Sequence, residues 1–366
     1  MLQNWLKPLT ATFFKSVEQL PAHSLGKNLL AFRDQLPDLK KVRAVLIGLD
    51  EKEANEIRQA LYRTVNIFPP GAIADLGNLR KADAAQLIPV VYELLSGKVA
   101  PILIGGPGSL APAQFLAYQE AKALANLAVV DERPRFTLDK KKPDAYDPLL
   151  LPRHPLLFHF ELIGYQVHQT PPAILDFLQQ QHFDAIRLGK TRAALEETEP
   201  LIRDADLMCF HLGALKQSEA PGVENASPSG YFLEEACQLC RYAGMSDKLT
   251  SFGVYDFRRE LDRDGQTAQA AAQLVWYFLD GLFGRKGDFP ASKDGLTEYI
   301  VDSRKHHFQL TFWRSNRTGR WWMQVPVNEK RKYQRHRLIP CSYLDYQAAC
   351  REELPERLFY ALKRFG

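Results

Sequence analysis

The sequence predicts a three-layer α/β/α fold built around a mainly parallel sheet. Short apolar runs alternate with helical patterns over most of the 366 residues. These runs are apolar throughout, which is typical of strands covered by helices on both faces. Apolar residues make up 46% of the chain and charged residues 25%, so the chain is long and apolar enough to bury a core.

The first 41 residues are expected to form a helical segment that packs on the body. Leu6, Leu9, Phe13, Val17 and Leu20 fall on one helical stripe before the first apolar run. A stripe of this kind usually docks on its own domain.

The body, residues 42–284, carries the alternation of strands and helices. The expected strands are residues 42–49, 101–106, 127–131, 156–164, 183–189, 206–212 and 250–256. The expected helices are residues 51–64, 82–96, 109–125, 172–181, 191–203, 231–243 and 267–282. In such a fold, functional residues are expected at the carboxyl ends of the strands.

The third expected unit, residues 285–366, is a basic aromatic extension entered through a Gly- and Pro-containing linker, residues 284–295. Residues 303–340 hold ten Lys or Arg and one Glu, a net charge of +9, which leaves −5 for the rest of the chain. The runs QLTFW and RWWMQVP around SNRTG predict a β-hairpin.

This extension has two interpretations. Basic residues among aromatics could bind single-stranded nucleic acid through stacking and phosphate contacts. Alternatively, the aromatics pack on the body and the extension forms a protein interface, with one of two adjacent strand tryptophans left at the surface. We favour the second interpretation, because no RNA-binding motif accompanies the charge. The interface candidates are Trp313, Trp321, Trp322, Arg331, Lys332, Arg335 and Arg337.

Several features bear on cellular location. The longest apolar stretch is interrupted by Gln273 and Asp280 and is too short to span a bilayer. The N-terminus lacks a signal-peptide pattern, and five cysteines form no disulfide framework. Cys237 and Cys240 form a CxxC pair on a helix, which we interpret as packing because no second pair has zinc-site spacing. We therefore expect a cytoplasmic protein without a membrane span.

Four segments in order carry a family resemblance. They are PILIGGPGS from Pro101, LAVVDERPR from Leu127, FHLGALKQSEAPG from Phe210 and FGVYDFRRELDRDGQTAQAAA from Phe252. Together they resemble the arginase, agmatinase and formimidoylglutamase family of ureohydrolases. The segments IADLGN and ASPSGY support the formimidoylglutamase branch. The resemblance implies a central parallel sheet of about eight strands.

The family binds two manganese ions that hold a hydroxide for attack on a guanidinium or formimino carbon, and the resemblance implies where the ligands would stand. Asp131 survives at one ligand position, and Asp256 survives at a later acidic position. The other family ligand positions are changed, with His211 a possible replacement ligand. These changed positions hold Gly108, Arg133, Arg135, His211 and Gly213.

Two candidate ligands cannot neutralise two dications, and two arginines would add repulsion where the ions would lie. We therefore expect a metal-free pseudoenzyme without a cofactor, with a scaffolding or protein-interaction role through a partner or self-association. Arg133 or Arg135 is expected to pair with Asp131 or Asp256. Two alternatives remain: a divergent formimidoylglutamase-like amidinohydrolase, and nucleic-acid binding through the C-terminal extension.

Overall fold

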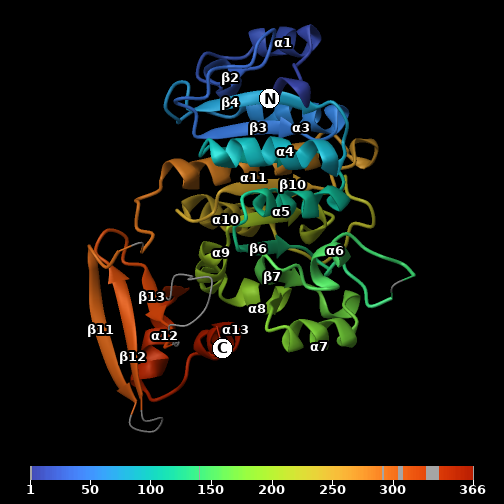
Figure 1. Cartoon of the computed structure of the whole chain (residues 1–366). Coiled ribbons are helices and arrows are strands. Elements are labelled where there is room, and N and C mark those ends of the chain that lie inside the picture. Colours follow the sequence, from blue (N-terminus) through green and yellow to red (C-terminus); the bar gives the residue numbers. More distant parts are fainter. Residues whose placement is uncertain (1, 140, 291, 304–307, 327–337, 366) are drawn as a thin grey trace.

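The computed structural model of the chain describes residues 2–139, 141–290, 292–303, 308–326 and 338–365 (Figure 1). It contains a large sheet covered by helices and a separate four-stranded antiparallel sheet formed by the C-terminal part. Among the described residues, no helix combines the length and apolar character needed to cross a bilayer.

The large sheet confirms the predicted fold class. Eight parallel strands follow the order β4-β3-β5-β10-β9-β6-β7-β8, in agreement with the expected number of about eight, and two short N-terminal strands extend the ten-stranded sheet beside β4. Their bounds are β3 Ala44–Gly48, β4 Ile73–Leu79, β5 Ala100–Ile104, β6 Ala125–Val130, β7 Leu157–Tyr165, β8 Asp184–Arg187, β9 Leu207–His211 and β10 Ser251–Tyr255. The strand β4 was not expected from its sequence, because Asp75, Gly77 and Asn78 interrupt its apolar pattern.

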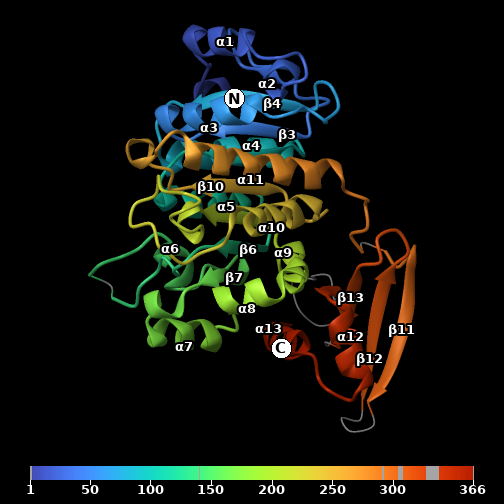
Figure 2. The ribbon, with the colours of Figure 1, turned by 180° about the vertical axis from the view of Figure 1, so that it is seen from behind.

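Two helical layers cover the sheet (Figures 1 and 2). Helices α3, α10 and α11 pack together on one face, and α4 and α5 pack on the other. Successive residues of a strand pack into opposite cores. In β3, Leu46 packs against the first helical layer, whereas Val45 and Ile47 pack against the second. The bounds are α3 Glu51–Arg63, α4 Ala84–Ser96, α5 Ala111–Glu120, α6 Asp147–Leu150, α7 Pro172–Gln180, α8 Leu188–Ala193, α9 Glu199–Asp204, α10 Leu233–Met245 and α11 Gln266–Phe283.

Local sequence signals set the ends of these helices. Asp50 caps α3 by accepting hydrogen bonds from the backbone amides of Lys52 and Glu53, and Asp83 caps α4 by accepting one from Gln86. The single helix expected over residues 191–203 is wrong. The structure has α8 and α9 instead, separated by a 3₁₀ turn, and Pro200 stands in the first turn of α9, where proline is tolerated.

The N-terminal segment is less helical than its apolar stripe suggested. Only Ala11–Glu18 (α1) and Leu25–Asn28 (α2) are α-helical, while Leu6–Lys7 (β1) and Leu30–Ala31 (β2) pair with β4. Leu6 is fully buried as a strand residue, and Phe13 and Val17 bury the inner face of α1. The stripe therefore packs on the body, although Leu6, Leu9 and Leu20 lie outside a helix.

The C-terminal sheet has the order β11-β12-β13-β14. Its strands are β11 Leu296–Ser303, β12 Phe308–Ser315, β13 Trp321–Gln324 and β14 Leu338–Cys341, followed by helices α12 Tyr343–Cys350 and α13 Glu356–Phe365. The expected hairpin is present as β12 and β13, paired antiparallel across residues 316–320. Helix α13 returns toward α8 and the edge of the large sheet (Figure 1).

Candidate functional site

The candidate site lies at the carboxyl edge of the large sheet, where the fold brings together residues far apart in sequence. Asp131 follows β6, His211 ends β9, and Asp256 follows β10. Gly108 begins the turn after β5. Because these strands are parallel neighbours, their ends meet at one edge of the sheet.

Arg135 links the two carboxylates of this site. Its Nε and Nη2 donate to Asp131, the latter over 3.5 Å, and its Nη1 lies 3.0 Å from Asp256 Oδ2. The side chains of Arg135 and Asp131 are 11% and 0% exposed. A guanidinium fork meets carboxylates well because its several N–H groups lie in one plane. Arg135 therefore supplies the positive charge that these buried acids require.

His211 is held between two partners. Its Nδ1 lies 2.7 Å from Asp256 Oδ2, and its Nε2 lies 2.9 Å from the hydroxyl of Tyr146. Both ring nitrogens are thus engaged inside the protein. A histidine binds a metal through an unprotonated nitrogen lone pair, so His211 would have to give up one of these bonds to become a ligand.

The backbone completes the pairing of the two carboxylates. Asp256 Oδ1 accepts the amide N–H of Gly108 over 2.7 Å, and Asp131 Oδ1 accepts that of Glu132 over 2.8 Å. Every carboxylate oxygen of Asp131 and Asp256 therefore has a donor from the protein itself.

The electrostatic environment differs between the two acids. Burial raises the pKa of Asp131 to about 7, although Arg135 and His211 oppose the shift. Burial acts in the same direction on Asp256, but the hydrogen bond and charge of His211, with the charge of Arg135, hold its pKa well below the usual range. These acids also raise the pKa of Arg135, which therefore stays charged. The site is a closed ion-pair network around one arginine.

Two glycines allow this network to close. A Cβ at Gly108 would lie 2.8 Å from Asp256 Oδ1 and 2.9 Å from Arg135 Nη1. A Cβ at Gly213 would lie 2.2 Å from Glu132 Oε2. Contacts this short exclude any larger residue unless the neighbours move. The space that a ligand side chain would need at these positions is filled by Arg135, Asp256 and Glu132.

Arg133 does not join the network. It is 43% exposed, and its Nη1 pairs with Asp144 over 3.1 Å. Of the two arginines expected to replace the metal charge, Arg135 alone contacts Asp131 and Asp256. Sequence reasoning missed Tyr146 and Glu132, because neither lies at a position where the resembled family has a ligand.

The residues present do not fit a pair of manganese ions. A binuclear site needs several anionic oxygen ligands with free lone pairs. Here the oxygens of both aspartates are occupied by protein donors, and a guanidinium lies between them. Arg135 would repel a dication at the position where the aspartates could bind it.

The C-terminal interface candidates divide into two groups. Trp313, Trp321 and Trp322 are 5%, 8% and 2% exposed. The expectation that one of the adjacent tryptophans stays at the surface is wrong: Tyr346 of α12 stacks on Trp321, and Arg203 of the body lies 4.4 Å over the ring of Trp322. Arg331, Lys332, Arg335 and Arg337 lie outside the described residues.

Comparisons with known proteins agree on one family. The model of the arginase family matches residues 174–280. Formimidoylglutamase of Streptococcus gordonii is 24% identical over 241 residues, which cover 59% of this chain and 71% of that protein. A crystal structure of Trypanosoma cruzi formiminoglutamase with Mn²⁺ is similar with a TM-score of 0.60 and 17% identity, covering 72% of this chain and 99% of that one. The formimidoylglutamase of Bacillus subtilis has a TM-score of 0.62 and 17% identity, covering 72% and 92% of the two chains.

Proposed function

We propose that this chain is a non-catalytic member of the arginase family, whose model matches residues 174–280, with a protein-interaction or scaffolding role. The observation that carries the proposal is the position of Arg135. The guanidinium bridges Asp131 and Asp256, the surviving acids of the resembled site, and so takes the place of the metal charge.

Exposed apolar side chains support an interaction role for the C-terminal extension. Seven large ones lie on it: Phe289, Ile300, Tyr343, Leu344, Leu354, Phe359 and Leu362. Grouped exposed apolar side chains mark contact surfaces more often than isolated ones do. Trp313 of β12 and Trp321 and Trp322 of β13 are buried, so a partner would contact the exposed apolar side chains instead.

The second candidate is an amidinohydrolase, because relatives similar to this chain are named formimidoylglutamases. That activity would require two metal ions at the edge where Arg135 lies. It would therefore require Arg135 to leave both aspartates and His211 to release Asp256 or Tyr146.

Metal content separates the two candidates. We expect that the protein, purified with added Mn²⁺ and then dialysed, binds no Mn²⁺ at Asp256. Its Mn²⁺ content should therefore equal that of the Asp256→Asn variant. It should release neither formamide nor urea from formimino and guanidino substrates. Elemental analysis and a product assay measure both, with Asp256→Asn as the matched variant. Two ions per chain that this variant loses, together with product release by the unmodified protein, would establish the amidinohydrolase instead.

Salt-dependent binding tests the nucleic-acid alternative. We expect labelled single-stranded RNA to bind weakly at physiological salt, because Trp313, Trp321 and Trp322 are buried and offer no stacking surface. Each phosphate contact should lower the logarithm of the affinity by about 0.7 per log unit of salt. Changing Arg331, Lys332, Arg335 and Arg337 together to Gln should matter no more than changing the exposed Lys40 and Lys41. Submicromolar binding that only the first set abolishes would replace the interaction role with RNA binding.

A further inference from the structure

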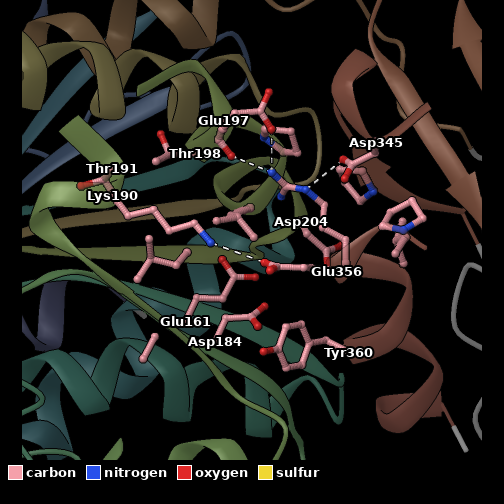
Figure 3. A pocket seen from close by; sticks show the side chains of 18 of the residues that line it. Glu161, Asp184, Lys190, Thr191, Glu197, Thr198, Asp204, Asp345, Glu356 and Tyr360 are labelled. Atoms are coloured by element: carbon pink, nitrogen blue, oxygen red, sulfur yellow. Dashed lines mark hydrogen bonds and ion pairs between the residues drawn. The ribbon is translucent and has the colours of Figure 1, made fainter. Parts of the chain in front are cut away.

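A second polar cluster lies in a pocket between the body and the C-terminal helices (Figure 3). The pocket has a volume of about 770 Å³ and lies between β7, β8 and α8 on one side and α12 and α13 on the other. Glu161 and Asp184 point into it from the sheet, and Tyr360 of α13 faces them.

Three side chains of this cluster could share an ion. His159 and Glu161 alternate along β7 and so lie on one face of the sheet. Asp184 begins β8 and is in register with Glu161. His159 Nε2 lies 2.9 Å from Asp184 Oδ2 and 3.4 Å from Glu161 Oε1. One ligand atom from each of the three side chains lies within 4.8 Å of the others. An ion bound among them would replace the hydrogen bond between His159 Nε2 and Asp184 Oδ2.

The cluster leaves buried polar atoms without partners. Glu161 is 1% exposed, yet its Oε2 has no hydrogen-bond partner among the residues that the structure describes, and neither has Nδ1 of the fully buried His159. A buried carboxylate oxygen without a donor costs free energy unless a cation or a proton joins it. An unpartnered acid at the wall of an open pocket therefore points to a positively charged occupant.

Asp184 and Asp204 add negative charge beside Glu161, and Arg364 and Lys248 are the cations near it. Lys248 pairs with Asp204 and Asp206.

We propose that His159, Glu161 and Asp184 bind one divalent transition-metal ion, with Zn²⁺ as the probe. Two carboxylates balance the charge of a dication, and a neutral imidazole with two carboxylates is a ligand set that zinc accepts. Ligand atoms about 2.0 to 2.2 Å from an ion lie about 2.8 to 3.6 Å from one another in tetrahedral or octahedral sites. The separations of 2.9 Å and 3.4 Å fall in this range.

This site is separate from the arginine-filled one. Glu161 is paired with Ala128 in the interior of β6, whereas Asp131 follows the end of that strand. Both acids of the proposed site line a pocket that also exposes Lys190 and Glu356, which gives an ion a route from solvent. The inference goes beyond the proposed function and does not depend on it.

Titration of chelator-treated protein with Zn²⁺ tests the proposal. Calorimetry and elemental analysis after dialysis should show one ion per chain, and Co²⁺ in place of Zn²⁺ should give visible absorption bands. Glu161→Gln or Asp184→Asn should weaken Zn²⁺ binding at least about tenfold, since even groups that only orient ligands contribute about 10- to 100-fold. Asp184 is 13% exposed, so Asp184→Asn serves if Glu161→Gln does not fold.

Two matched variants locate the ion. Glu356→Gln changes an exposed acid at the same pocket that pairs with Lys190 over 3.4 Å, and it should leave the affinity within twofold. Asp256→Asn should do the same. No binding by the unmodified protein at millimolar Zn²⁺, or binding that Glu161→Gln and Asp184→Asn leave unchanged, overturns this inference alone. Binding that only Asp256→Asn abolishes overturns it and also places a metal at the site where the proposed function has none.

Discussion

Replacing Arg135 with methionine is expected to lower the free energy of unfolding by about 3 to 5 kcal/mol, the loss typical of removing one partner from a buried ion pair. Methionine keeps much of the aliphatic volume but leaves Asp131 and Asp256 facing each other without a cation. Asp131 is buried, with 0% side-chain exposure, and Asp256 is 15% exposed, so water would replace the guanidinium only in part.

Arg133→Met provides the control. Arg133 is half-exposed and pairs with Asp144 at the surface, so its loss should cost about 0 to 1 kcal/mol. Urea unfolding followed by tryptophan fluorescence measures both variants. Equal losses for the two would mean that Arg135 does not hold the acids together, and the proposed role of its charge would fail.

Replacing Arg203 with methionine is expected to cost about 3 kcal/mol and to loosen the C-terminal sheet from the body. Arg203 of α9 is 5% exposed, and its Nη2 donates to the carbonyls of Trp321 and Cys341 over 3.1 and 3.2 Å. Its guanidinium also covers the ring of Trp322 and pairs with Glu199. The variant would leave two carbonyls and a carboxylate without this donor.

Arg241→Met is the matched control on the neighbouring helix α10. Arg241 is 40% exposed and pairs with Asp280 over 2.6 Å, so we expect a loss of about 0 to 1 kcal/mol. Limited proteolysis should cut Arg203→Met between residues 284 and 295 faster than it cuts Arg241→Met. If both variants resist the protease as the unmodified chain does, other contacts hold the sheet in place.

The fold could be predicted further than the site. Apolar runs identified most strands of the body because a parallel sheet buries both faces of each strand. The strand β4 was not predicted because it contains the polar residues Asp75 and Asn78. Both accept hydrogen bonds from the buried Arg58 of α3, a contact that no local sequence pattern indicates. The ordered segments that resemble the arginase family supplied the carboxyl-edge positions, and the comparisons with known proteins support that resemblance.

The contacts within the site could not be predicted from the sequence. The sequence made Arg133 and Arg135 equal candidates for pairing with the acids. The path of the chain after β6 directs Arg135 to the acids and Arg133 to Asp144. The second cluster had a signal that was not used: His159 and Glu161 stand at alternate positions of an otherwise apolar strand. A buried strand rarely carries two ionisable residues on one face unless they have a partner.

The close packing around Gly108 and Gly213 makes the altered site hard to reverse. Any side chain placed at position 213 would meet the Glu132 carboxylate, and any at position 108 would meet Asp256 and Arg135. A mutation that restored one ligand at either glycine would therefore require the neighbouring carboxylate or guanidinium to move. Return to a metal site would require several coordinated substitutions, with Arg135 and Glu132 among the residues that must change or move. Once established, the arginine-filled state would persist through single mutational steps.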